Sequence, residues 1–192
     1  TRTPPADARG GAPRLRARRP GAWPPRRRPA DRRALSQNPP MRISAKVDYA
    51  VRAAVQLAAA EGDRATKGDT IAQAQSIPLK FLENILSDLR HAGLVRSQRG
   101  AEGGYWLNRP ASEITIADVI RAVEGPLASV RGQRPEDVSY EGPAEPLLQV
   151  WIAVRGSLRS VVEHVTLADV AAGDLPEHVV ALASDPQAWT TR

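Results

Sequence analysis

The spacing of apolar residues changes its period after Gly93, and this change most constrains how the chain can fold. Before that glycine, apolar side chains recur at intervals of three and four residues, which is the period of amphipathic helices. Three such segments are predicted, at residues 44–60, 66–75 and 77–93. Thr66, with Asp69 three positions later, is expected to cap the second helix, and Pro78 is expected in the first turn of the third.

The chain beyond Gly93 is predicted to form a β-hairpin. Residues 94–99 and 105–107 are short apolar segments that partly alternate, and glycines dominate the turn at residues 100–104. Three helices followed by a hairpin within about seventy residues is the element order of a winged helix-turn-helix. We therefore expect a mainly α fold with a small β-wing.

A long apolar helix is predicted outside this first domain. Thr115 and Asp118 repeat a capping signature in front of a fourth helix, which ends at Gly125. After a loop, apolar residues recur at alternating intervals of four and three, at Leu147, Trp151, Val154, Leu158, Val161 and Val165. This spacing is typical of a helix that packs against another helix. We expect it to form a homodimer; packing against the chain's own winged helix-turn-helix is the alternative.

The positive charge of the chain is concentrated at its N-terminal end. The first forty residues contain eleven arginines, nine prolines and two acidic residues, a composition typical of disorder. The net charge of +6 comes entirely from this segment, so it does not indicate that the remainder binds DNA. Met41, the only methionine, stands where helical periodicity begins. Residues 1–40 are either an extension from a misplaced start codon or a tail that adds sequence-independent affinity for phosphates.

Several classes of protein and site are excluded by the residues that the sequence lacks. With no cysteine, the chain has no disulfide, no thiolate metal site and no cysteine-ligated iron–sulfur cluster. Its three histidines lie far apart. No apolar run approaches the roughly 18–20 residues of a membrane span, and no secretory signal is found, so we expect a cytoplasmic protein. It has no phosphate-binding glycine loop and no nucleophile elbow, so neither an enzyme nor a cofactor is expected.

The third helix has the polar face that a DNA recognition helix needs. Opposite its apolar stripe stand side chains suited to base edges or phosphates: Lys80, Phe81, Glu83, Asn84 and Ser87, with His91 near the end. Lys80 can donate to guanine, Glu83 can accept from cytosine, and Asn84 can pair with adenine. Phe81 is suited to a thymine methyl group, with a place in the core as the alternative. An ordinary solvated face is the alternative for the others.

The predicted wing carries two arginines beside its glycine turn. Arg96 and Arg99 are placed to reach DNA, because an arginine at the tip of a hairpin can enter a narrow minor groove. Gly103 and Gly104 would allow a close approach to the DNA backbone. Together these residues and the third helix predict binding to double-stranded DNA.

Several motifs, in the same order, resemble the IscR/NsrR (Rrf-type) family of bacterial winged-helix transcription regulators. The segments that carry the resemblance are residues 41–51, 77–86, 99–105, 114–127 and 166–170. Among them, Arg99-Gly100 followed by Gly103-Gly104-Tyr105 is similar to the family's Arg-Gly-x-x-Gly-Gly-Tyr wing. The resemblance covers most of residues 41–172.

The resemblance implies a homodimer that binds an inverted-repeat operator, usually as a repressor. It places base reading on Lys80, Phe81 and Glu83, the minor-groove contact on Arg99, and dimerisation on the long helix. Cluster-binding members carry three cysteines before that helix, whereas residues 128–145 of this chain contain none. The resemblance is therefore to the clusterless branch, some members of which respond to a metabolite or a partner protein.

The loop before the long helix occupies the position where family members sense their effector. Tyr140, Arg131 and Arg134 are candidates for binding a small anion there, with a plain connecting loop as the alternative. The predicted divisions are a disordered extension (1–40), a winged helix-turn-helix domain (41–126), the sensing-position loop (127–145), the dimerisation helix with a short closing helix (146–172), and a tail (173–192). The competing function is a winged-helix module that binds protein and does not read DNA.

Overall fold

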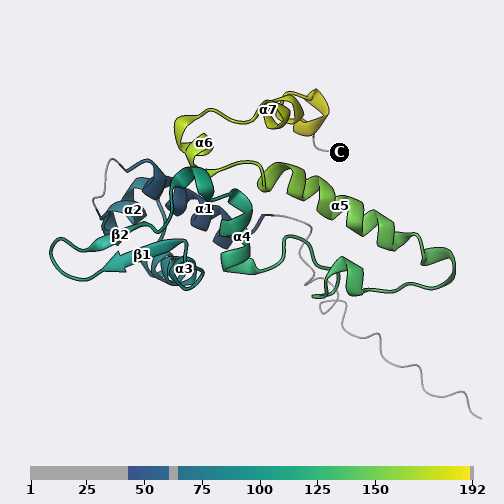
Figure 1. Ribbon diagram of the computed structural model, residues 1–192, viewed down its shortest axis with the longest axis horizontal. Coiled ribbons are helices and arrows are strands. Elements are labelled where there is room, and N and C mark those ends of the chain that lie inside the picture. The colour runs from purple at the N-terminus through teal and green to yellow at the C-terminus, as the bar shows by residue number, and fades with distance from the viewer. Residues whose placement is uncertain (1–42, 61–64, 191–192) are drawn as a thin grey trace, which may run out of the picture. The chain divides into compact units, whose positions relative to one another are not determined.

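The computed structural model describes residues 43–60 and 65–190 (Figure 1). The predicted disorder of residues 1–40 lies outside the described residues. Within them the fold is mainly helical with one two-stranded antiparallel sheet, as the sequence predicted. No described helix has the length and apolar character needed to cross a membrane.

Helix α1 (Ala45–Ala58) is the centre of the core. The Ser44 hydroxyl accepts a hydrogen bond from the Val47 amide at 3.1 Å and so caps the helix. The buried face combines Val47 and Leu57 with three alanines, Ala50, Ala53 and Ala54. These short side chains let neighbouring helices approach closely, and α1 packs against α2, α3, α4 and α6.

Helices α2 (Gly68–Gln75) and α3 (Leu79–His91) form the helix-turn-helix. The prediction that Thr66 caps α2 is wrong, because Lys67 holds the N-cap position and makes no side-chain cap bond. Thr66 instead exchanges two backbone hydrogen bonds of 2.8 Å with Tyr105 in the wing. Pro78 stands at the N-cap of α3, one position before the first turn.

The wing consists of β1 (Val95–Gln98) and β2 (Gly104–Leu107), paired antiparallel with Val95 opposite Leu107. It follows α3 directly: Gly93 has φ +72°, and the Leu94 amide donates to the Leu89 carbonyl at 2.9 Å. In Figure 1 the loop between the strands projects beyond the helices. The predicted hairpin is confirmed.

Helices α4 (Ile116–Glu124) and α6 (Leu167–Ala172) begin side by side. Each starts with a capping box, Thr115 with Asp118 and Thr166 with Asp169. The two starts are joined by backbone hydrogen bonds of 2.9 Å from Ile116 to the Val165 carbonyl and from Leu167 to the Ile114 carbonyl. Leu167 is fully buried, so α6 belongs to the same core as α1.

Helix α5 (Leu147–Val162) follows the loop, which contains 3₁₀ turns at Pro135–Asp137 and Gly142–Ala144. The apolar stripe predicted through Val165 ends earlier, because the helix stops at Val162. Val165 is buried, and its carbonyl accepts the hydrogen bond from α4. It is thus a core residue and not a continuation of the helical stripe. Helix α7 (Glu177–Ala183) and a 3₁₀ turn (Pro186–Trp189) complete the described chain.

Candidate nucleic-acid interface

The turn between α2 and α3 is held by a residue with positive φ. Ser76 has φ +52° and ψ +43°, a left-handed conformation that is uncommon for residues other than glycine. The next residue, Ile77, is buried and donates a backbone hydrogen bond to the Ala72 carbonyl at 2.9 Å. The tight turn and the buried isoleucine fix the direction in which α3 leaves α2.

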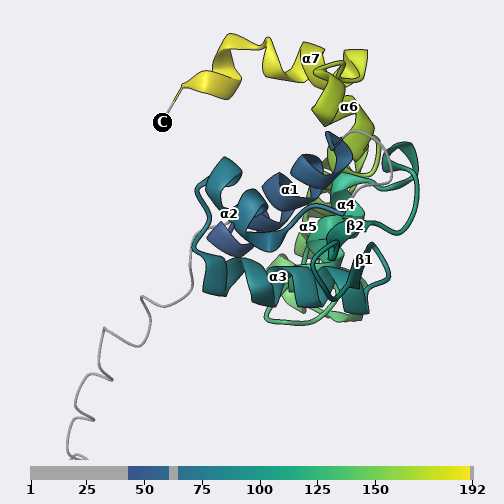
Figure 2. The same cartoon turned by 90° about the vertical axis from the view of Figure 1, so that its left-hand side faces the viewer.

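Helix α3 separates an apolar face from a polar face. Leu82, Ile85, Leu86 and Leu89 are buried in the core. The predicted base-contacting residues Lys80, Phe81, Glu83 and Asn84 are exposed, and Ser87 is half-buried. In Figure 2 this helix runs along the lower edge of the domain, below α1 and α2. The structure thus brings the predicted polar residues of the third helix onto one accessible face.

Lys80 and Glu83 form an ion pair on this face. The Lys80 Nζ and a carboxylate oxygen of Glu83 are 3.4 Å apart, and their side chains are 89% and 52% exposed. An exposed pair of this kind contributes about 0–1 kcal/mol. Breaking the pair so that each side chain can contact a base edge therefore costs little free energy. In the absence of DNA bases, Lys80 also neutralises the Glu83 carboxylate, which would otherwise repel phosphates.

An aromatic cluster that the sequence analysis missed supports the start of α3. The half-exposed Phe81 ring meets Tyr49 of α1 edge to face, with centroids 6.1 Å apart. The Arg52 guanidinium lies 5.4 Å from the centre of the Tyr49 ring and pairs with Asp48 at 3.0 Å. Phe81 is thus both anchored and accessible. The three-residue spacing of Tyr49 and Arg52 in α1 was the signal available in the sequence.

The two arginines of the wing occupy different settings. The Arg96 guanidinium lies over the ring of its cross-strand partner Trp106, 4.7 Å from the ring centre. Arg99 follows β1 in the exposed turn. Trp106 was not among the residues predicted at the interface, because its place opposite Arg96 depends on the register of the two strands. Arg99 is therefore the arginine at the exposed end of the wing, while Arg96 is stacked on its side.

Arg99→Ala is expected to lower affinity for all DNA sequences by a similar factor and to reduce the salt dependence of binding. A phosphate or minor-groove contact releases about one counterion, so the slope of log K against log salt should fall by about one. Fluorescence anisotropy across a salt series measures it. An unchanged slope would remove Arg99 from the interface, and Arg131→Ala, which deletes an exposed arginine outside the wing, is the matched control.

The wing is anchored at its base by Tyr105. Besides the two backbone hydrogen bonds to Thr66, its half-buried ring lies close to Gly68 at the start of α2 and packs against the core. Tyr105, predicted with the DNA contacts, is thus placed where it joins the wing to the helix-turn-helix.

Gly103 and Gly104 are required by contacts within the protein itself. A Cβ atom at Gly103 would lie 2.3 Å from the Gln98 carbonyl oxygen, and one at Gly104 would lie 2.7 Å from that of Thr66. The close approach that these glycines permit is therefore to the chain's own backbone. Their expected closeness to the DNA backbone stays a prediction.

Gly103→Ala is expected to destabilise the protein by about 1–3 kcal/mol, because the turn must shift to make room for the methyl group. Gly68→Ala is the matched control: its Cβ would meet Tyr105 at an ordinary 3.6 Å. Chemical unfolding of both variants measures the difference. Equal stabilities would show that the turn relaxes without cost.

Helix α5 is apolar, yet none of its residues is fully buried. On the predicted dimerisation face, Leu147 and Leu158 are 38% and 37% exposed, and Val150, on the same side, is 48% exposed. Trp151, Val154 and Val161 are half-buried. The Trp151 indole donates to the Tyr140 hydroxyl at 2.9 Å, so it also holds the preceding loop against α5.

The known proteins that this chain resembles are transcriptional regulators. Residues 43–173 match the model of the Rrf2 family, described as an iron-dependent transcriptional regulator. A protein of Mycobacterium tuberculosis named as an HTH-type transcriptional regulator, Rv1287, is 57% identical over 77% of this chain and 92% of its own length. The regulator CymR of Bacillus subtilis is 38% identical over 68% of this chain and 90% of its own.

The residues between α4 and α5 do not fit an iron site of the kind that the family description, iron-dependent, suggests. Residues 128–145 contain no cysteine, and in the part of the chain that the structure describes no three histidine, aspartate or glutamate side chains gather into a metal site. The Tyr140 hydroxyl within this stretch accepts a hydrogen bond from the Trp151 indole. Iron chemistry is therefore not carried over to this chain.

Solved structures share the fold. The structure of CymR, titled the global cysteine regulator of B. subtilis, aligns with a TM-score of 0.60 and 36% identity, over 70% of this chain and 98% of that one. The T. potens IscR structure aligns with a TM-score of 0.55 and 29% identity, over 83% and 96%. Sequence, element order and fold agree, and the chain belongs to the Rrf2 family of HTH transcriptional regulators.

Proposed function

We propose that this regulator is a homodimeric repressor that binds an inverted-repeat operator without an iron–sulfur cluster. The observation that carries the proposal is the exposed polar face of α3, with Lys80, Glu83 and Asn84, beside a wing that ends in Arg99. A helix of this kind reaches base edges in the major groove while the wing contacts the neighbouring groove.

The exposed apolar face of α5 supports the dimer. Three large aliphatic side chains, Leu147, Val150 and Leu158, lie on one side of a helix that buries none of its residues within the chain. A second copy covering this face would remove it from water. A twofold dimer presents two copies of α3, and the two half-sites then lie one or more helical turns of DNA apart.

The relatives suggest which genes to examine first. The CymR structure is titled as that of a cysteine regulator, and we include sulfur-assimilation genes among the candidate targets on that likeness. Mapping of bound sites across the genome tests this choice and supplies the operator. Sites that cluster in unrelated pathways would refute the sulfur assignment while leaving the DNA-binding proposal intact.

The DNA-binding proposal is tested with the full chain and its own upstream region. We expect a gel shift that persists over competitor DNA, weakens steeply with salt, and protects a symmetrical footprint with two protomers bound. The competing function, a winged-helix module for protein binding, predicts no sequence preference. Absence of salt-sensitive, sequence-preferring binding to both the upstream region and genomic fragments would favour that module.

A further inference from the structure

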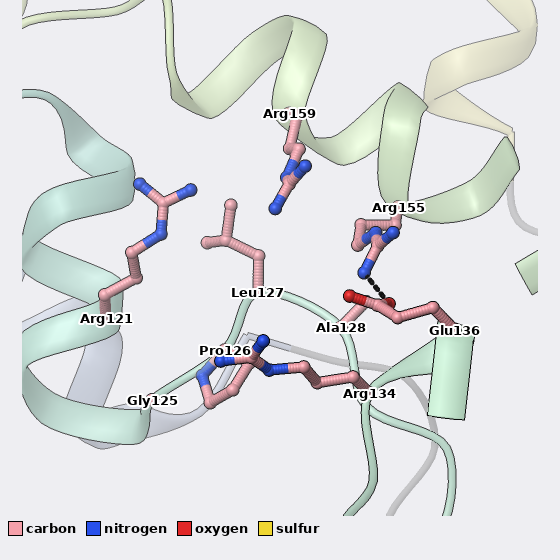
Figure 3. A pocket seen from close by; sticks show the side chains of 9 residues that line it. All are labelled: Arg121, Gly125, Pro126, Leu127, Ala128, Arg134, Glu136, Arg155 and Arg159. Carbon is pink, nitrogen blue, oxygen red and sulfur yellow. Dashed lines mark hydrogen bonds and ion pairs between the residues drawn. The ribbon is translucent and has the colours of Figure 1, made fainter. Parts of the chain in front are cut away.

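A pocket with a volume of about 390 Å³ lies between α4, the loop after it and α5. Its lining includes four arginines that come from three separate parts of the chain: Arg121, Arg134, Arg155 and Arg159. Figure 3 shows the side chains of Arg121, Arg134 and Arg159 around Leu127, and Arg155 joined to Glu136. The volume falls within the roughly 300–1,000 Å³ of small-molecule sites.

Positive charge in this pocket exceeds the negative charge that faces it. Arg155 pairs with Glu136, and Glu163 is shared between Arg121 and Arg159. Asp118 lies 3.9 Å from Arg121, but it is equally close to Arg109 and its carboxylate also serves the cap of α4. Two carboxylates thus face four guanidinium groups, which leaves a surplus of two positive charges.

Arg134 is the arginine available to a ligand. In the described part of the chain it forms no ion pair, and it is an exposed residue that lines the pocket. The positive charge of Arg134 acts on Glu136. The pKa of that carboxyl group is lowered by a backbone hydrogen bond and by Arg155, and Arg134 lowers it further. A guanidinium that forms no direct ion pair and lines a pocket with three other arginines favours an incoming oxyanion.

We propose that this pocket binds a small molecule carrying two negative charges on carboxylate or phosphate oxygens. Two charges match the surplus, and the planar forks of Arg134 and Arg159 suit the paired oxygens of either group. Of the residues first considered for an anion, the pocket includes Arg134 but neither Arg131 nor Tyr140. The site is distinct from the face of α3 and needs no DNA.

Binding would have a consequence for the contact between α4 and α5. Glu163, at the end of α5, pairs with Arg121 of α4 and lies 3.5 Å from the Nε of Arg159. A bound dianion competes with the Glu163 carboxylate for both guanidinium groups. The ligand therefore weakens an ion-pair link between the helix-turn-helix domain and α5.

Calorimetric titration of the full chain at constant ionic strength tests the site. The probes are succinate and citrate for carboxylates, and inorganic phosphate and glycerol phosphate for phosphates. We expect saturable binding of at least one probe, with one site per protomer. The carboxylate and phosphate arms then identify which oxyanion the site prefers. No saturable binding in either arm would overturn the proposal.

Two variants with opposite expected effects make the test specific. Arg134→Gln should weaken binding about tenfold or more, the loss expected for a charge-assisted contact. Glu163→Gln should strengthen it roughly two- to fivefold, because Arg121 and Arg159 lose a competing partner of ordinary surface-pair strength. Weaker binding in Glu163→Gln would overturn the proposed competition, because Glu163 would then hold Arg121 and Arg159 in place for the ligand.

Arg131→Gln is the matched control, since it removes the same charge from the same loop outside the pocket. The arginines of residues 1–40 are present in every variant, so binding at that segment would leave all affinities alike. Equal affinities in Arg134→Gln and Arg131→Gln would overturn the proposal. So would a fall in operator affinity of Arg134→Gln without any anion, because the arginine would then serve the DNA backbone.

Discussion

Leu158→Asp is expected to convert the proposed dimer into monomers and to lower operator affinity by about a hundredfold or more. Leu158 is 37% exposed on the apolar side of α5, shared with Leu147 and Val150. A carboxylate there would be buried without a partner at a dimer interface, which is strongly unfavourable. Once the protomers separate, the two half-sites are no longer bound together, and linked binding typically contributes a factor of about 10²–10⁴.

Gln149→Asp is the matched control for this variant. Gln149 is exposed and lies two and a half helical turns before Leu158, on the opposite side of α5 at about 100° per residue. It adds the same charge away from the apolar face, so the dimer should persist. Sedimentation velocity reports the mass, and anisotropy reports the affinity. A dimeric Leu158→Asp protein would refute the assignment of α5 as the dimer interface.

Trp151→Asp is a less selective test of the same interface. The sequence pattern placed Trp151 in the dimerisation stripe, but its indole also donates to Tyr140 in the loop before α5. The substitution would release that loop as well as charge the helix, so its effect on assembly would have two sources. Leu158, which makes no such polar contact with the loop in the described structure, separates them.

Glu83→Ala is expected to relax discrimination at one or two base positions of each half-site by about 1–3 kcal/mol, or roughly 5- to 150-fold. Its carboxylate is exposed on α3, and among the described residues its one ion-pair partner is the exposed Lys80, so it is available to accept from a cytosine amino group. Lys80→Ala should relax discrimination at a different base position. Binding to a library of operator variants measures both.

The control for this experiment is Glu177→Ala, which removes an exposed carboxylate from α7, outside the helix-turn-helix. It should leave the sequence preference unchanged. If Glu83→Ala instead raises affinity for every sequence by the same factor, the carboxylate only repels phosphates and reads no base. Equal loss for every sequence would likewise contradict a base-reading role.

The helices were predictable because the spacing of buried apolar residues along the sequence identifies the face that packs in the core. The spacing of Leu82, Ile85 and Leu89 in the third helix, and the capping box at Thr115, correspond directly to what the structure shows. These features depend on residues within a few positions of one another. Local patterns therefore gave both the element order and most of the boundaries.

The features that sequence alone did not predict depend on contacts between distant segments. Thr66 has a side chain suited to an N-cap, but its backbone pairs with that of Tyr105, thirty-nine residues later. The N-cap of α2 is therefore the next residue, Lys67. Val165 continues a heptad pattern, yet it is buried where α4 and α6 meet. In both cases a long-range backbone pairing overrides the local preference.

The exposed polar residues of the candidate site were predicted from the sequence, whereas the contacts that hold Arg96 and Phe81 in place were not. Lys80, Glu83 and Asn84 are exposed as a polar helical face requires, and these short-range expectations needed only the helical period. The stacking of Arg96 on Trp106 depends on strand register, and the edge-to-face contact of Phe81 with Tyr49 depends on helix packing. Those are properties of the assembled domain.

The paired starts of α4 and α6 fix where the chain returns to the core after α5. The backbone bonds of Ile116 and Leu167 hold the two helix starts together at 2.9 Å, and α4 itself packs against α1 and α3, so the chain leaves the core only after α4 and returns to it at Val165. Doubling the length of a flexible loop costs only about 0.6 kcal/mol, so insertions between α4 and α5 need not displace Leu167 from the core. Changes of length in this segment would therefore leave the proposed DNA-binding face of α3 in place.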